Sequence, residues 1–172
     1  MLLNLDSQIL LLLIPALVFS LCVHEFSHGI IAYYYGDDTA YRYGRLTLNP
    51  LKHLDPIGSL MLLFIGFGYA KPVPVNPLNL NNPRHDMIKV AAAGPISNLI
   101  LAFTGTFFLY FIFHVNPYFL TKTLNMFFQL FIQINIFLAI FNLLPIYPLD
   151  GGQIFGNILS KKFPEFNTYM QL

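Results

Sequence analysis

Two histidines and a glutamate form a compact group in the first part of the chain. His24 and His28 are four positions apart, and Glu25 directly follows the first of them. On an α-helix this spacing places both imidazoles on one face, where they can ligate a single metal ion. Glu25 then lies where a general base for a metal-bound water belongs. The pattern predicts a metal site that supports hydrolysis.

These three residues lie within a strongly apolar stretch. Ionisable groups inside a membrane span are costly and are usually functional. The alternative is a hydrogen-bonded polar cluster that only holds helices together. We disfavour it, because placing three ionisable groups at this spacing in lipid has a high free-energy cost for a contact that only joins helices.

A catalytic zinc usually has three protein ligands and one position for water, so one ligand remains to be found. Asp150 is the best candidate. It follows a helix end broken by proline, and the glycines at 151 and 152 permit a tight turn there. Glu165 is the only glutamate downstream of the histidines, and it lies in the tail. The alternative role for Asp150 is a helix N-cap that precedes Gly151.

Composition identifies an integral membrane protein. The chain has 172 residues, of which 56% are hydrophobic and 10% charged, and its mean hydropathy is +0.61. Soluble domains carry about 25% charged residues. The net charge of +1 gives no indication of nucleic-acid binding. The single cysteine, Cys22, excludes an internal disulfide and is best interpreted as a small buried apolar residue.

Hydropathy predicts an all-α membrane protein with three spans in a single domain over residues 1–172. The spans are expected at about 9–35, 87–114 and 123–145. The first lacks a basic n-region, so we interpret it as a retained span and not as a cleaved signal peptide. The apolar stretch 57–69 is too short to cross a bilayer, which favours a re-entrant or interfacial segment.

The region between the first two spans is expected to be partly extended. Alternating residues over 41–48 suggest a strand or β-hairpin. Residues 71–83 contain four prolines, so this stretch cannot be helical and should be extended.

The distribution of basic residues orients the spans. The N-terminal tail has none, and the loop 115–122 has only Lys122. The region 36–87 contains five: Arg42, Arg45, Lys52, Lys71 and Arg84. The positive-inside rule then places the N-terminus outside and both the 36–87 region and the C-terminus in the cytoplasm. His24 and His28 would lie near the cytoplasmic face.

Two motifs together carry a family resemblance. One is His24-Glu25-x-x-His28, and the other is Asn142-x-x-Pro-x-x-Pro-Leu-Asp150-Gly-Gly at the end of a later helix. In this order they resemble the site-2 proteases, which are M50-like intramembrane zinc metalloproteases. Three intervening stretches resemble the small prokaryotic branch without a PDZ domain: His53-Leu-Asp-Pro-Ile-Gly58, Lys71-Pro-Val-Pro-Val-Asn-Pro77 and Ala93-Gly-Pro-x-x-Asn98. The similarity runs from about residue 15 to residue 160.

The resemblance implies a role for each site residue. His24, His28 and Asp150 would hold one zinc ion, and Glu25 would move a proton from water to the leaving amine. Asn142 would donate a hydrogen bond to the tetrahedral oxyanion, although an interhelical hydrogen bond is its alternative role. The implied partners are the lipid bilayer and transmembrane protein substrates, and the implied location is a prokaryotic cell membrane. We hypothesise that the 71–83 segment pairs with the unwound strand of such a substrate by β-augmentation.

Two further polar residues are better explained by structural roles than by catalysis or metal binding. Asn98 is interpreted as a packing or hydrogen-bonding residue within its span. His53 could hydrogen-bond to a metal ligand or contact the substrate. We prefer the alternative, a loop histidine that caps a helix or is solvated.

The two functional hypotheses differ in class. The first is a zinc-dependent intramembrane endopeptidase. The second is a non-catalytic membrane scaffold or metal-binding protein that keeps the protease fold. Glu25 discriminates between them, because a scaffold has no reason to retain a general base beside the two histidines.

Overall fold

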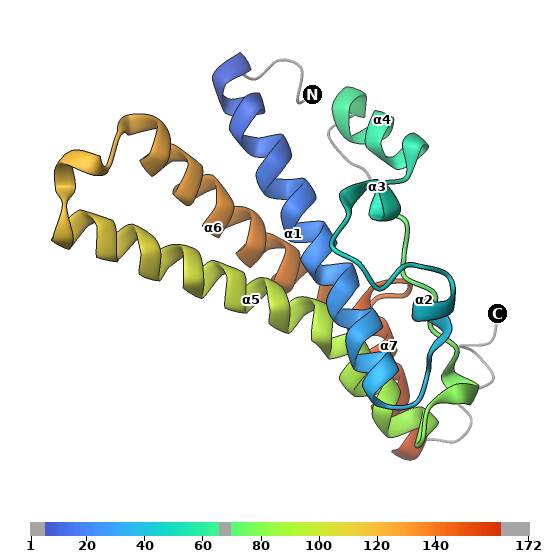
Figure 1. Cartoon of the computed structure of the whole chain (residues 1–172). Coiled ribbons are helices and arrows are strands. Elements are labelled where there is room, and N and C mark those ends of the chain that lie inside the picture. The colour runs from blue at the N-terminus through green and yellow to red at the C-terminus, as the bar shows by residue number, and fades with distance from the viewer. Residues whose placement is uncertain (1–5, 66–69, 163–172) are drawn as a thin grey trace.

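Three long helices dominate the computed structural model, which describes residues 6–65 and 70–162 (Figure 1). They are α1 (Ser7–Tyr34), α5 (Pro83–Val115) and α6 (Lys122–Asn142). Each is long and apolar enough to cross a membrane. The predicted all-α membrane fold with three spans is therefore confirmed. The third helix ends at Asn142, three residues before the predicted end at 145.

Local sequence accounts for where these helices begin. The Asp6 carboxylate accepts from the Gln8 amide at 2.8 Å and caps α1. Pro83 occupies the first turn of α5, where its missing N–H costs nothing. Thr121 caps α6 through a 3.2 Å hydrogen bond from the Leu124 amide. The Asn116-Pro117 sequence ends α5, and the short 3₁₀ helix η3 (Pro117–Phe119) leads into α6.

The interior of the bundle is built mainly from small residues. Small side chains let helix backbones approach closely, which is how helices associate in lipid. A Cβ added at Gly105 of α5 would lie 3.0 Å from the Phe131 ring of α6. Large aromatics on the same helices face outward, and Phe103 is 74% exposed. The buried small residues of the long helices include Ala16, Ala32, Ala91, Ala102 and Ala139. Outward aromatics and inward small residues match a bundle surrounded by lipid.

The region between α1 and α5 contains short helices: α2 (Thr39–Arg42), α3 (Pro50–His53), α4 (Pro56–Ile65) and the 3₁₀ helix η2 (Pro77–Asn79). The β-hairpin predicted over 41–48 is wrong. Asp37 and Asp38 favour one helical turn at Thr39–Arg42, and Gly44 (φ +62°) then reverses the chain. In the described part of this region the only pairing is one isolated bridge, between Leu54 and Ala70.

Helix α4 covers part of the stretch predicted to be re-entrant or interfacial. It has 10 residues and is about 15 Å long, too short to span a bilayer. Its membrane placement stays a prediction, and residues 66–69 of that stretch lie outside the described residues.

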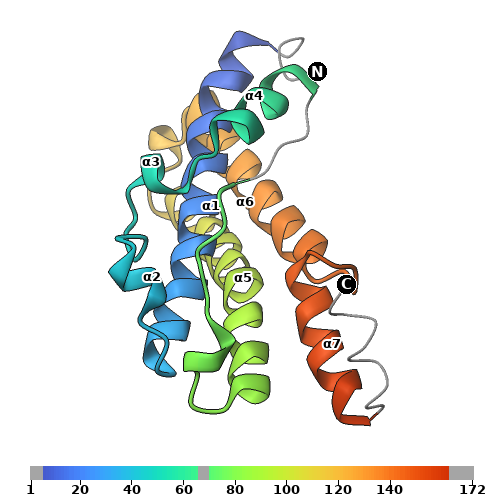
Figure 2. The ribbon, with the colours of Figure 1, turned by 90° about the vertical axis from the view of Figure 1, so that its right-hand side faces the viewer.

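The last helix, α7 (Asp150–Lys162), returns alongside the N-terminal half of α5 (Figure 2). Helix α5 also packs against α1 and α6. The C-terminal part of α1, the first half of α5 and the start of α7 therefore meet in one place. This is where the predicted ligands lie.

Candidate metal centre

The three predicted ligands come together. His24 Nε2 lies 3.2 Å from Asp150 Oδ2, and His28 Nε2 lies 3.4 Å from Asp150 Oδ1. One ligating atom from each residue falls within 4.8 Å of the others. All three side chains are largely buried, the most exposed being Asp150 at 14%. Their role as ligands stays a prediction, but the structure places them as that role requires.

The two glycines after Asp150 allow α7 to begin at this point. A Cβ on Gly151 would lie 2.3 Å from the carbonyl oxygens of Leu143 and Leu144, at the end of α6. On Gly152 it would lie 2.8 Å from Ile146. No side chain fits at either position without moving backbone. The pair brings the first turn of α7 against the end of α6, with the Asp150 carboxylate turned toward the imidazoles.

Gly94 of α5 forms the floor of the cluster. A Cβ there would lie 2.4 Å from His28 Nε2 and 2.6 Å from His24 Nε2. Both distances are far below van der Waals contact, so only glycine leaves room for the two rings. The space beside both Nε2 atoms therefore depends on this one residue.

The hydrogen bonds behind the rings determine which nitrogens face the centre. His28 Nδ1 lies 2.8 Å from the Val90 carbonyl oxygen, and His24 Nδ1 lies 2.6 Å from Asn98 Oδ1. Oxygens of this kind only accept, so each Nδ1 carries the proton and donates. The Nε2 atoms are then left for the cluster, as in metal-bound histidines whose other nitrogen is held by an acceptor.

This arrangement fits a divalent cation. The Asp150 carboxylate lies against both Nε2 atoms. Two neutral imidazoles would turn their Nε2 lone pairs toward that carboxylate and repel it. Asp150 Oδ2 is buried and has no hydrogen-bond partner. A cation among the three donors would offset this repulsion and give Asp150 Oδ2 a partner. The His₂Asp donor set suits zinc.

Glu25 lies beside the cluster on α1 and is engaged by a segment from the connecting region. Its Oε2 accepts a 2.8 Å hydrogen bond from the Val73 amide. The prediction that the whole of 71–83 is extended is wrong in part, because Pro77–Asn79 form η2 and Pro83 begins α5. We call residues 71–76, which contain no helix, the strap. Its start is fixed by Arg45, whose Nη2 donates to the Lys71 carbonyl at 2.6 Å and to the Pro72 carbonyl at 3.3 Å. The strap thereby lies over α1 at the predicted base.

The far end of the strap is anchored by Asp37. This carboxylate accepts from the Asn76 amide at 2.7 Å and from Asn79 Nδ2 at 3.1 Å, and it also binds the backbone and hydroxyl of Thr39. Burial raises the pKa of Asp37, but these hydrogen bonds outweigh burial and lower it below its usual range. A charged Asp37 thus ties the end of the strap to the start of α2.

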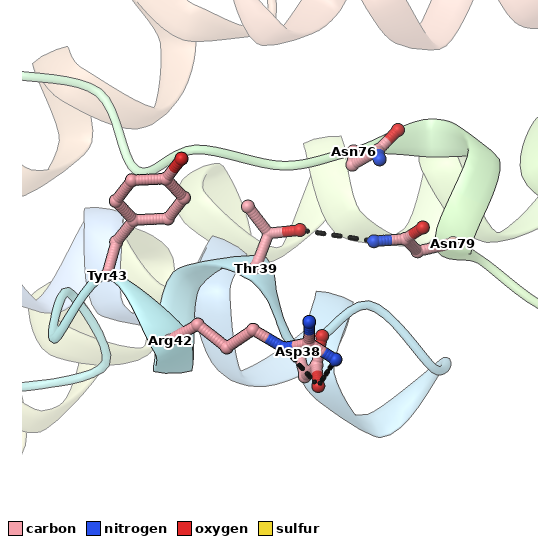
Figure 3. Close-up of a pocket in the computed structure, with 6 residues that line it drawn as sticks. All are labelled: Asp38, Thr39, Arg42, Tyr43, Asn76 and Asn79. Carbon is pink, nitrogen blue, oxygen red and sulfur yellow. Dashed lines mark hydrogen bonds and ion pairs between the residues drawn. The ribbon is translucent and has the colours of Figure 1, made fainter.

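A polar recess of about 440 Å³ opens beside this anchor (Figure 3). Asn79 donates to the Thr39 hydroxyl across it, and Arg42 pairs with Asp38 at its edge. None of the three predicted ligands lines it. The recess therefore belongs to the connecting region and not to the metal centre.

Two other predicted residues have different surroundings. Asn142, the proposed oxyanion donor, is half-buried at the end of α6, and its Nδ2 donates to the Leu138 carbonyl of its own helix at 2.9 Å. Among the described residues no hydrogen bond joins it to the cluster, and its role stays a prediction. His53 is buried at the end of α3, and its Nε2 lies 2.6 Å from the Thr47 carbonyl oxygen. This contact agrees with the capping role preferred from the sequence, but the solvated alternative is wrong.

Comparison with known proteins identifies the family. Residues 112–170 match the model of peptidase family M50. A protein of Bacillus subtilis named "Putative zinc metalloprotease YwhC" is 46% identical over 151 residues, covering 86% of this chain and 68% of that protein. The chain belongs to peptidase family M50, the site-2 protease family.

Two other relatives are more distant. "Putative zinc metalloprotease Rip2" of Mycolicibacterium smegmatis is 36% identical over 55% of this chain and 38% of that protein. "Zinc metalloprotease MJ0392" of Methanocaldococcus jannaschii is 29% identical over 84% of this chain and 33% of that protein. This M50 chain therefore spans about two thirds of the Bacillus relative and less than half of the other two. No solved structure matches it significantly.

Sequence reasoning missed part of this M50 site. The sequence predicts a packing or hydrogen-bonding role for Asn98, and the structure confirms the hydrogen bonding, but the partner, the predicted ligand His24, is not predicted. Asn135 of α6 and Ser20 of α1, which hold Asn98 in turn, were not singled out. The available signal was a polar side chain in the middle of an apolar span, which needs a partner in lipid.

Proposed function

We propose that this M50 protein is a zinc-dependent endopeptidase that cleaves peptide bonds in or near transmembrane helices of other membrane proteins. The observation that carries the proposal is the convergence of His24, His28 and Asp150 inside a bundle of membrane-spanning helices. Zinc metalloprotease names among its relatives support the choice of metal. One zinc ion per chain is expected, because the cluster supplies one set of three donors.

Each protein group has a task in this proposal. A zinc ion held by the three ligands would polarise the scissile carbonyl and lower the pKa of water to about 7. Glu25 accepts the proton of the attacking water and delivers it to the leaving amine. The Val73 amide engages only one of its oxygens, Oε2, and so orients the carboxylate while the other oxygen handles the proton. Asn142 is retained as a candidate donor to the oxyanion.

The substrate helix must unwind before hydrolysis. A transmembrane helix satisfies all its backbone hydrogen bonds internally, which shields its carbonyls from water. The strap is the proposed partner for the unwound strand. Pro72 and Pro74 have no N–H, and the amides of Val73 and Asn76 already donate to side chains. Pairing would therefore use mainly strap carbonyls as acceptors for substrate amides.

We place the protein in a prokaryotic cell membrane as a multi-pass protein, with its N-terminus outside and the metal centre near the cytoplasmic face. The support is the concentration of basic residues in the 36–87 region. The predicted ligands on α1 also lie in its C-terminal half, toward that region.

Cleavage is tested with purified wild-type protein and a Glu25→Gln variant. Each is added to a detergent extract of membrane proteins from the organism in which the protein naturally occurs. New N-termini are then identified by mass spectrometry. We expect termini inside or near membrane spans with the wild type only, lost on chelation and restored by zinc. If wild type and variant give the same termini, the endopeptidase proposal is wrong, and a metal-binding scaffold becomes the better account.

A further inference from the structure

A buried chain of polar side chains connects three helices behind His24. Asn98 of α5 contacts His24 Nδ1 at 2.6 Å, and its Nδ2 donates to Asn135 Oδ1 of α6 at 2.8 Å. Asn135 Nδ2 donates to the Ser20 hydroxyl of α1 at 2.8 Å. Ser20, Asn98 and Asn135 are each 0% exposed. Three fully buried polar side chains within a membrane bundle mark a specific arrangement, because each would be costly without its partners.

The direction of every hydrogen bond in this chain is determined by the backbone at its far end. The Ser20 hydroxyl donates to the Ala16 carbonyl at 2.8 Å, so toward Asn135 it can only accept. Asn135 Nδ2 also donates to the Phe131 carbonyl at 2.8 Å, which fixes its amide group. Its Oδ1 must then face Asn98 and accept from it.

The same logic fixes the amide of Asn98. Its Nδ2 donates to Asn135 and lies 3.5 Å from the Ser20 carbonyl oxygen, so the nitrogen points away from the metal centre. Its Oδ1 is left facing His24 Nδ1, and an amide oxygen only accepts. His24 must therefore carry its proton on Nδ1.

We propose that Asn98 is a positioning residue, supported by Asn135 and Ser20, that holds His24 in the Nδ1–H tautomer with Nε2 directed at the metal. This inference rests on the proposed function, since it assumes that His24 is a metal ligand. The two histidines differ in this respect. His28 is held by a main-chain carbonyl, that of Val90, which no substitution of a side chain removes. His24 alone depends on a side chain.

The primary test is zinc affinity in detergent, measured by competition with a chromophoric chelator. Removing a group that orients a ligand typically costs 10–100-fold in metal affinity. We expect a loss of that size for Asn98→Leu and a smaller loss for Asn135→Leu, which leaves Asn98 in contact with His24. Asn98→Asp keeps an acceptor for Nδ1–H but loses the donor to Asn135 Oδ1, so its affinity should fall between those of the wild type and Asn98→Leu.

The matched control is Gln133→Leu, which makes a similar change at an exposed position of α6, two residues from Asn135. It should leave zinc affinity unchanged. Unaltered affinity in Asn98→Leu, or an equal loss in Gln133→Leu, would overturn the proposal.

A second readout needs no variant and so does not depend on folding of Asn98→Leu. In ¹⁵N NMR of the zinc-loaded wild type with labelled histidine, His24 should show a protonated Nδ1 and a metal-bound Nε2. Ligation through Nδ1 would overturn the inference. The two proposals can fail separately: a wild type that binds no zinc refutes the proposed function, whereas a wild type that binds zinc independently of Asn98 refutes only the positioning role.

Discussion

The metal centre and the connecting region between α1 and α5 are held together in different ways. In the centre, the contacts behind His24 join side chains of different helices, as in His24, Asn98 and Asn135, although His28 is held by the Val90 carbonyl. In the connecting region, side chains bind the backbone: Glu25 and Arg45 hold the strap through its amide and carbonyl groups. The prolines of the strap prevent it from forming regular structure of its own, so it depends on these contacts.

This difference separates two kinds of consequence. Changes in the centre should alter metal binding, because they move the ligands themselves. Changes in the connecting region should alter cleavage or stability and leave the metal in place. Glu25 belongs to both regions, since it lies on α1 beside the ligands and also receives the Val73 amide.

The largest effect is expected for Glu25→Gln. General acid–base groups contribute roughly 10²–10⁴-fold to rate, so cleavage should fall by about that factor. Glutamine retains a carbonyl oxygen to accept from the Val73 amide, so the strap should remain in place. Initial cleavage rates of a substrate found in the N-terminus analysis, together with zinc content, provide the check. Turnover close to wild type would contradict the assigned base.

Gly94→Ala tests the centre itself. The new Cβ would overlap both imidazoles. Overpacking of this kind costs about 1–3 kcal/mol, which corresponds to roughly 5–150-fold in zinc affinity. The control is Gly105→Ala, whose Cβ would meet the Phe131 ring on α6 at 3.0 Å, away from the ligands. That variant should lower Tm and keep its zinc affinity. Equal zinc affinity in wild type and Gly94→Ala would show that the centre can accommodate an added methyl group, contrary to the geometry.

Arg45→Met tests the connecting region. Arg45 is 8% exposed and donates to two strap carbonyls, and hydrogen bonds from charged groups contribute about 1.5–3 kcal/mol. We expect a lower Tm and cleavage reduced several-fold, with full zinc content. Arg42→Met removes an exposed helix pair with Asp38 and should change little. Loss of zinc from Arg45→Met would contradict the proposal that changes in the connecting region leave the metal in place.

The smallest effect is expected at Asp37 and depends on pH. Its pKa is lowered in the folded state, so the charged carboxylate stabilises the fold above the unfolded pKa of about 3.9. This contribution is lost as the pH falls through the lower folded value. The Tm of wild type should therefore exceed that of Asp37→Asn at pH 7, and the difference should narrow as the pH falls below about 4. A difference that stays constant from pH 7 to pH 3 would mean that the charge of Asp37 does not stabilise the anchor.

The sequence predicted the spans well, because long apolar runs report burial in lipid directly. It also selected His24, His28 and Asp150, since two spaced motifs restrict which residues can meet. The β-hairpin over 41–48 failed because a short alternation is outweighed by local capping from Asp37 and by the turn at Gly44.

The contact between Asn98 and His24 could not have been predicted from the sequence. It depends on the rotation and depth at which α5 packs against α1, and the close approach of the two helices needs a residue without a Cβ at Gly94. The hydrogen bond between Val73 and Glu25 could not be predicted either, because the position of Val73 depends on Arg45 and Asp37, which hold the two ends of the strap.

The central claim is that three residues from two distant parts of the chain hold one metal ion. The most direct test is the zinc content of the detergent-purified wild type beside His24→Ala and Asp150→Ala, after reconstitution with zinc and removal of the excess. We predict about one zinc per chain in the wild type, as for a site with a single set of three protein ligands, and a clear reduction in both variants. Zinc lost from His24→Ala but fully retained by Asp150→Ala would contradict the three-ligand centre.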